Sequence, residues 1–208
     1  MSGLKVVCVI STGFIESNCF VVYDEISKKC VIIDSGEKAD AVINKIDELG
    51  LTPEILINTH GHFDHIAADD KLRVKYNIPL AIHEIDVEML SDPYKNASVM
   101  TGKDLYVKAP EIILKEGSYK TSFCSYSVIH TPGHTQGSVC ILIDKWLFAG
   151  DTLFKGTIGR TDFPGGSSQM MKKSLQKIKQ FDKDTEVFPG HGDSTFISEE
   201  LAKNIYLR

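Results

Sequence analysis

The hexapeptide HGHFDH, residues 60–65, is the stretch that decides how this chain folds. It places His60, His62 and His65 around the carboxylate of Asp64. The whole chain has seven histidines among 208 residues, so this density is far from the scatter expected of core histidines. Imidazole and carboxylate groups are metal ligands in proteins. The hexapeptide therefore predicts a metal site.

Four apolar runs that are typical of strands each lead into a residue able to bind a metal. They are Ile55 to Asn58 before His60, Phe123 to Ile129 before His134, Trp146 to Phe148 before Asp151, and Thr185 to Phe188 before His191. A glycine directly precedes each of the last three ligands, and Gly61 separates His60 from His62. Glycine permits sharp turns and close backbone approach, which a crowded cluster needs. We expect the four strand ends to converge.

The pool of candidate ligands exceeds the needs of one ion. A catalytic zinc site takes three protein ligands and a water. The chain offers five histidines and two aspartates for this role: His60, His62, Asp64, His65, His134, Asp151 and His191. This supply matches two adjacent ions about 3.5–4 Å apart, which can share a hydroxide nucleophile. The ligand types suit zinc, iron or manganese and leave the metal open.

The remaining pattern predicts an α/β protein. Short β-branched or aromatic runs between turn residues predict strands over Lys5 to Ile10, Cys19 to Tyr23, Cys30 to Ile33, Leu80 to His83, Ile112 to Leu114 and Ser138 to Ile143. Apolar residues at helical spacing predict helices over Lys38 to Leu49, Ile66 to Tyr76, Glu84 to Leu90, Ser167 to Phe181 and Ser198 to Tyr206. The segment from Pro93 to Pro110 predicts a long loop, a candidate wall of a substrate mouth.

The length and the net charge of the chain limit the classes of function that it can have. A chain of 208 residues without a repeat or a low-complexity linker predicts a single domain over residues 1–208. The formal net charge of -5 leaves no basic field to attract nucleic acid or an anionic membrane. We therefore expect a small-molecule substrate, no nucleic acid and no membrane. The oligomeric state stays open.

The cysteines and the N-terminal sequence indicate the cellular compartment of the protein. The five cysteines are odd in number, lack CxxC spacing and mostly lie in apolar runs, which predicts buried, reduced thiols. The chain opens without a basic leader followed by a long apolar segment, and no later run approaches the ~20 apolar residues of a membrane span. Together these features predict a cytoplasmic protein.

The series HxHxDH, TPGHT, GD and PGH resembles the motif series of the metallo-β-lactamase superfamily, over residues 55–192. The resemblance implies a four-layer αββα sandwich with the metals at one edge of two sheets. It also implies the ligand sets. A first ion would be held by His60, His62 and His134, a second by Asp64, His65 and His191, with Asp151 bridging both.

Two longer stretches, TPGHTQGS at residues 131–138 and GDTLFKGTIGRTDFPGG at residues 150–166, resemble the glyoxalase II-like hydrolases, in particular their short single-domain relatives. This resemblance implies hydrolysis of a thioester such as an S-2-hydroxyacylglutathione by metal-bound hydroxide. Asp64 and Asp151 would be the catalytic carboxylates, and two zinc ions are our first expectation. Arg160 stands where larger relatives carry a lysine, and its guanidinium suits a substrate carboxylate. The larger relatives also carry a tyrosine and a C-terminal helical domain that have no counterpart here.

Other activities stay open. The stretch GRTDF, residues 159–163, also resembles persulfide dioxygenases, which use a single iron held by a histidine of the hexapeptide, His134 and Asp151. Another metallo-hydrolase such as a lactonase, or a relative without catalysis, is less favoured, the latter because all seven ligand positions are filled. A β-lactamase is also less favoured, since many of those enzymes have cysteine in place of Asp151.

Four neighbouring residues complete the candidates. A metal-bound histidine usually donates its second ring N–H to an acceptor. Thr135, beside His134, and Asp193, just beyond His191, are candidate acceptors. His83 and His130 are expected to be structural, because the ligand set is complete without them.

Overall fold

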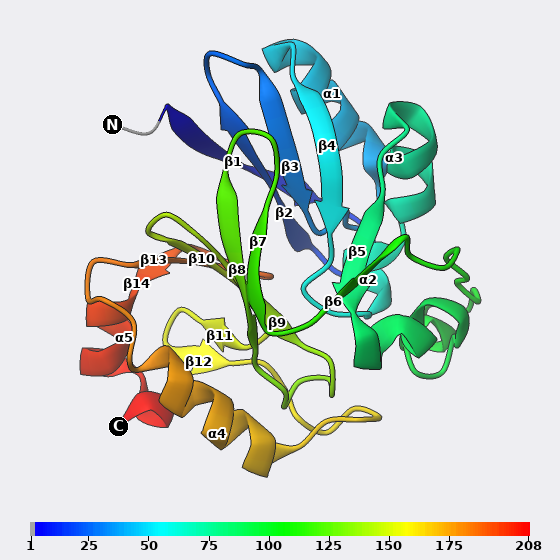
Figure 1. Cartoon of the computed structure of the whole chain (residues 1–208). Coiled ribbons are helices and arrows are strands. Elements are labelled where there is room, and N and C mark those ends of the chain that lie inside the picture. The colour runs from blue at the N-terminus through cyan, green and yellow to red at the C-terminus, as the bar shows by residue number, and fades with distance from the viewer. Residues whose placement is uncertain (1–2) are drawn as a thin grey trace.

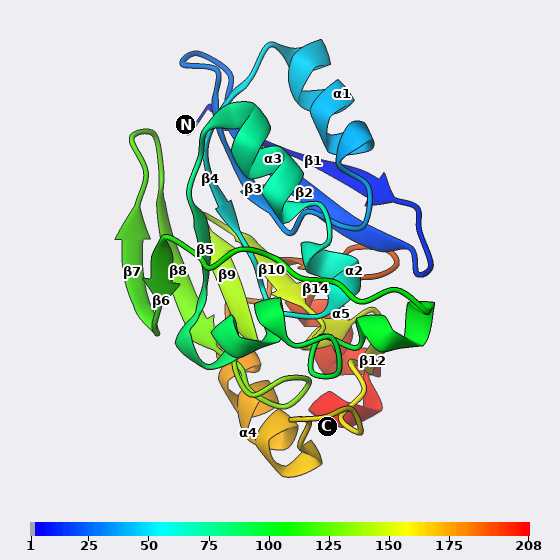
Figure 2. The same cartoon turned by 90° about the vertical axis from the view of Figure 1, so that its right-hand side faces the viewer.

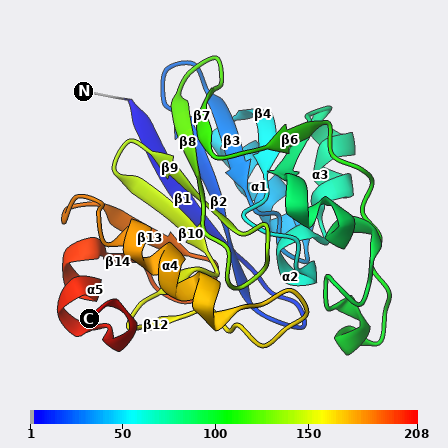
Figure 3. The ribbon, with the colours of Figure 1, turned by 60° about the horizontal axis from the view of Figure 1, so that its bottom comes forward.

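Two six-stranded sheets pack face to face, and helices cover the outer face of each one (Figure 1). The computed structural model describes residues 3–208. Figure 3 shows strands of both sheets lying between helices α4 and α5 on one side and α1 and α3 on the other. The fold is the expected four-layer αββα sandwich.

The first sheet contains the first six strands in chain order. They are β1 (Leu4–Ser11), β2 (Ser17–Asp24), β3 (Lys29–Ile33), β4 (Thr52–Ile57), β5 (Leu80–His83) and β6 (Ile112–Leu114). The first three strands pair antiparallel, and β3 to β6 pair parallel. The parallel connections carry helices α1 (Ala39–Leu49), α2 (Phe63–Ile66) and α3 (Asp69–Tyr76), of which α1 and α3 lie on the outer face of this sheet (Figure 2).

The second sheet has the order β14-β13-β10-β9-β8-β7. Its strands are β7 (Gly117–Lys120), β8 (Ser125–His130), β9 (Val139–Ile143), β10 (Trp146–Gly150), β13 (Glu186–Pro189) and β14 (Thr195–Phe196). The crossover from β10 to the parallel β13 contains the hairpin of β11 (Leu153–Phe154) and β12 (Thr157–Ile158) and then helix α4 (Ser168–Ile178). Helix α5 (Ile197–Lys203) follows β14.

The alternation of side chains between the two faces of each sheet explains the four layers. Successive side chains of a strand point to opposite faces of its sheet. In β3, Ile32 packs toward α1 and α3, whereas Ile33 packs between the two sheets. In β10, Phe148 packs between the sheets and Leu147 packs toward α4. Apolar side chains thus form three buried clusters, which hold the four layers together.

Residues next to α1 and α4 cap these two helices. Gly50 ends α1 in the left-handed conformation, with φ of 62°. The Ser167 side chain accepts a hydrogen bond from Met170 N and caps α4, whose buried face carries Leu175 and Ile178. Helices α1 and α4 are amphipathic, and each covers one sheet.

Several elements differ from their predictions. The helix expected over Ile66 to Tyr76 is two helices, because the carbonyl oxygen of His65 accepts hydrogen bonds from Ser35 N and Gly36 N rather than continuing the helix. The segment Glu84–Ser91 is a 3₁₀ helix, η1, and the long loop contains a second one, η2, at Ser98–Thr101. The C-terminal helix ends at Lys203, and Ile205–Leu207 form a 3₁₀ turn, η3. The short strands β7, β11, β12 and β14 were not predicted.

Across residues 3–208, none of the helices is both long and apolar enough to cross a membrane. All five cysteines are unpaired. Cys19, Cys30 and Cys140 are buried, as the sequence predicts, whereas Cys8 is exposed and Cys124 is half-buried.

Candidate metal centre

Strands from both sheets deliver the candidate ligands to one edge of the sandwich. Strands β8, β10 and β13 run in the same direction, so their carboxyl ends meet at that edge. His134 follows β8, Asp151 follows β10 and His191 follows β13. His60 follows β4 of the other sheet. The predicted convergence of strand ends is therefore present.

The structure brings all seven predicted ligands together. They form three overlapping groups: His60, His62 and His134; His60, His65 and Asp151; Asp64, His65 and His191. Within each group, one ligand atom per residue lies within 4.8 Å of the others. The first and third groups match the two expected ligand sets, and the cluster is compatible with a dinuclear site.

Asp151 lies between the two sets. Its Oδ2 atom is 3.3 Å from His134 Nε2 and 3.4 Å from His191 Nε2. His191 Nε2 is also 3.3 Å from Asp64 Oδ2. The position between a ligand of each set is the one that a bridging carboxylate requires.

The donor atoms fit metal ions. His60 Nε2 is buried, and among residues 3–208 it has no hydrogen-bond partner. A buried polar atom without a partner costs free energy, about 1–3 kcal/mol. His62 Nδ1 lies 2.8 Å from His134 Nε2. Nitrogen atoms directed at one another in this way are suited to sharing a cation.

Burial and neighbouring charges set the protonation of the cluster. Burial lowers the pKa of His60 well below its ordinary value and the pKa of His62 to about 3. Burial alone would raise the pKa of Asp151, but His134, His191 and His65 outweigh it and hold that pKa well below its usual range. Burial opposes the charging of His191, yet Asp151 and Asp64 raise its pKa to about 10. The neutral imidazoles of His60 and His62 and the protonated imidazole of His191 therefore lie beside ionised carboxylates.

Backbone carbonyl oxygens hold the second ring nitrogens of His134 and His191. His134 Nδ1 donates to the carbonyl oxygen of Arg160 at 2.8 Å, and His191 Nδ1 to that of Glu16 at 2.6 Å. The predictions that Thr135 and Asp193 accept these bonds are wrong. Thr135 donates its hydroxyl to Asp86, and Asp193 pairs with Lys155.

Asp34 is a supporting residue that the sequence analysis missed. Its Oδ2 atom is 2.9 Å from His65 Nδ1, and its Oδ1 accepts from Thr59 N at 2.7 Å. Asp34 follows the buried strand β3 directly. The pattern that found the ligands, an apolar run ending in a polar side chain, also applies to Asp34.

The glycine before His191 has a steric reason. A Cβ atom at Gly190 would lie 2.3 Å from Asp151 Oδ1 and 2.7 Å from the His65 ring. Any side chain there would collide with two candidate ligands. The PGH motif therefore reflects crowding, as the sequence analysis proposed.

A cavity of about 410 Å³ opens over the cluster. Its apolar walls include Ile15, Phe63, Ala97, Met100, Phe154 and Phe163. Ala97 and Met100 belong to the predicted long loop, which does contribute to the wall. A second cavity, of about 530 Å³, lies against α4 and the C-terminal turn and contains none of the seven ligands.

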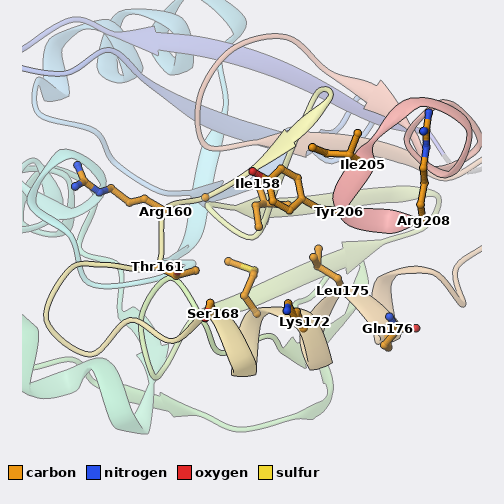
Figure 4. A pocket seen from close by; sticks show the side chains of 12 residues that line it. Ile158, Arg160, Thr161, Ser168, Lys172, Leu175, Gln176, Ile205, Tyr206 and Arg208 are labelled. Carbon is orange, nitrogen blue, oxygen red and sulfur yellow. The ribbon is translucent and has the colours of Figure 1, made fainter.

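Arg160 lies at the rim of the metal cavity. Its Nε and Nη2 atoms donate to the two carboxylate oxygens of Asp162, at 2.7 and 2.8 Å. The guanidinium also lies 3.8 Å from the centre of the Phe163 ring. Figure 4 shows this side chain pointing away from Leu175 and Tyr206, which line the second cavity. Arg160 lines both cavities and has an internal carboxylate, that of Asp162, as its partner.

The chain matches one known protein family and is similar to several known proteins over nearly its whole length. Residues 12–191 match the family described as the Metallo-beta-lactamase superfamily. An uncharacterized protein of Mycobacterium leprae is 38% identical, with 94% of this chain and 95% of that protein covered. The probable metallo-hydrolase YqgX of Bacillus subtilis is 34% identical, with 94% of each chain covered. The hydroxyacylglutathione hydrolase GloC of Haemophilus influenzae is 31% identical, with 96% of each covered.

Solved structures agree over most of the chain. The BLEG-1 B3 metallo-beta-lactamase is 37% identical with a TM-score of 0.93, covering 98% of this chain and 99% of its own. TTHA1623 in a di-iron-bound form is 30% identical with a TM-score of 0.83, covering 97% and 100%. ETHE1 from Myxococcus xanthus is 26% identical with a TM-score of 0.73, covering 91% and 78%.

Proposed function

The chain belongs to the metallo-beta-lactamase superfamily, and from that premise we propose that this metal-dependent hydrolase cleaves small thioesters of the S-2-hydroxyacylglutathione type. The observation that carries the proposal is the complete cluster of five histidines and two aspartates under an accessible cavity. The relative GloC, a hydroxyacylglutathione hydrolase of matching length, supports the choice of substrate class.

Two divalent ions, with zinc as our choice, would be held by His60, His62 and His134 and by Asp64, His65 and His191, with Asp151 between them. When bound, such ions make hydroxide available at neutral pH and stabilise negative charge on a carbonyl oxygen. The buried carboxylates of Asp64 and Asp151 keep the charge that a cation needs. Thus the chain itself contributes the arrangement of ligands rather than a separate general base.

The cavity walls would bind the substrate. The apolar side chains of Phe63, Met100 and Phe163 exclude water from one side of the cluster. We propose that Arg160 anchors a substrate carboxylate, which must replace Asp162 as its partner. Since both side chains are exposed, this ion pair is weak. Arg160 can therefore exchange Asp162 for a substrate carboxylate at little cost in free energy.

We also infer the setting of the reaction. Five unpaired cysteines fit a reducing compartment, and we propose the cytoplasm. We propose a single domain over residues 1–208 that acts on a small molecule, with neither nucleic acid nor a membrane as partner.

Metal analysis together with a substrate panel tests the proposal. Protein purified without added metal should contain about two zinc ions per chain and hydrolyse S-lactoylglutathione. The panel should include glutathione persulfide, because the GRTDF stretch resembles persulfide dioxygenases, which are the second candidate. It should also include a β-lactam, because BLEG-1 is a metallo-beta-lactamase. One iron per chain with oxygen uptake on the persulfide, or turnover of the β-lactam alone, would overturn the thioesterase proposal.

A further inference from the structure

Asp86 is a buried carboxylate outside the candidate ligand set. It lies in η1, and only 1% of its surface is exposed. Three donors converge on its two oxygens: Gly61 N at 3.1 Å, the Thr135 hydroxyl at 2.6 Å and Gly137 N at 2.7 Å. Burial raises the pKa of Asp86, and three hydrogen bonds to this one buried carboxyl group hold it in place.

The three donors belong to the two loops that carry the first ligand set. Gly61 lies between His60 and His62 in the hexapeptide. Thr135 and Gly137 follow His134 in the TPGHTQGS stretch. A single side chain therefore connects the backbone of the first loop with that of the second.

Both glycines are needed for this approach. A Cβ atom at Gly61 would lie 2.6 Å from Met89 Cβ in η1. One at Gly137 would lie 2.5 Å from Asp86 Oδ1. The glycine inside the hexapeptide and the glycine of TQGS thus have the same purpose, since each lets its loop reach η1.

We propose that Asp86 is a positioning residue, which holds the loops of His60, His62 and His134 at the separation that one metal ion requires. The inference rests on the proposed function, because it assumes that these three rings bind a metal. The second ligand set has its own support in Asp34, which contacts His65. Asp86 should therefore act on one of the two sites only.

The test measures zinc binding at both sites by competition with a chromophoric chelator, with hydrolysis measured separately. In Asp86→Asn an amide NH₂ group replaces one of the two acceptor oxygens and faces a donor. Loss of a supporting partner of a metal ligand typically weakens metal binding about 10- to 100-fold. We expect this loss of zinc affinity at the site of His60, His62 and His134, and an unchanged zinc affinity at the site of Asp64, His65 and His191. A general loss of stability would weaken both sites.

Milder variants keep the test valid even if Asp86→Asn fails to fold. Thr135→Val removes one donor to Asp86, and Thr135→Ser keeps it, so only the valine variant should weaken zinc binding. Asp92→Asn is the matched control, because Asp92 follows η1 but accepts from Tyr94 N and Lys95 N. Equal weakening of both sites, or unchanged zinc binding in Asp86→Asn and Thr135→Val, would overturn the inference. A wild-type protein that binds two zinc ions without thioester hydrolysis would contradict only the proposed function.

Discussion

At the scale of single residues, burial and neighbouring charges fix the protonation states of His60 and Asp151. Burial keeps His60 neutral, whereas three neighbouring histidines keep Asp151 ionised. Neutral imidazole and ionised carboxylate are the forms that bind metal ions. The apo-protein therefore needs few protonation changes at these two residues before a cation binds.

Replacing Arg160 tests the proposed anchor. Arg160→Ala should raise KM for S-lactoylglutathione about fivefold and leave kcat nearly unchanged, because a bidentate contact of about 1 kcal/mol is lost in the ground state. Asp162→Asn should lower the same KM, because it removes the competing carboxylate. Steady-state kinetics measures both values. A thioester that lacks carboxylates is the control, and an unchanged KM in Arg160→Ala would remove Arg160 from the substrate site.

His83 should make folding stability sensitive to acid. Burial, reinforced by the stacked ring of His130, lowers the pKa of His83 to about 4 from an ordinary 6.5. The folded state then binds fewer protons than the unfolded chain between these values, so the free energy of unfolding falls as pH falls from 6.5 to 4. We expect this group to contribute a loss of about 2 kcal/mol. Urea unfolding of metal-free wild type and His83→Phe at several pH values measures it, and parallel curves would contradict the prediction.

The sequence predicted the ligands and missed their supports for a physical reason. His60, His134 and Asp151 stand in short motifs or directly after strands, so local spacing reveals them. Asp34 and Asp86 act through contacts with residues that are distant in the chain. Of the two, Asp34 carried the same strand-end signal as the ligands, whereas Asp86 carried none.

At the scale of elements, the long apolar strands and the amphipathic helices were predictable from periodicity. The strands β11 and β14 have two residues each, too few for a repeating pattern. The break between α2 and α3 comes from the contact of the His65 carbonyl with the Ser35 loop, which periodicity does not encode. Tertiary contacts near the metal centre thus overrode local preference.

Asn96 should fix the loop that forms part of the cavity wall. Its buried side-chain amide donates to the carbonyl oxygens of Met89 and Leu105, and its backbone carbonyl oxygen accepts from Phe63 N at the start of α2. Asn96→Ala should lower the free energy of unfolding by about 2–3 kcal/mol, because buried acceptors lose their donor. It should also speed proteolysis within residues 93–110.

Chemical denaturation and limited proteolysis measure these effects. Asn44→Ala on the exposed face of α1 is the matched control and should change stability by less than about 0.5 kcal/mol. Normal protection of the loop in Asn96→Ala would show that the loop is held by other contacts.

At the scale of the whole molecule, the ligand groups connect the two sheets. Each of the three groups takes two residues from the half of the chain that forms the first sheet and one from the half that forms the second. Direct hydrogen bonds also cross between the halves, such as Val139 N to Thr59 O at 2.9 Å. Metal ions would add to this connection.

Metal removal should therefore lower thermal stability. An ion present at 1,000 times its dissociation constant stabilises the folded state by about 4 kcal/mol, which corresponds to a fall in Tm of about 10 °C on chelation. Calorimetry with and without a chelator measures the change, and re-addition of zinc should restore it. An equal Tm in both conditions would show that the ions do not join the sheets.

The order of the sheets along the chain has a practical consequence. The first sheet ends at Leu114, the second begins at Gly117, and the exposed residues Lys115 and Glu116 join them. A chain opened at this joint would consist of two halves that own one sheet each and only part of every ligand group. Since each half would carry only part of every ligand group, a metal ion bound to the whole cluster would strengthen their association, and a split reporter for metal ions could use this property.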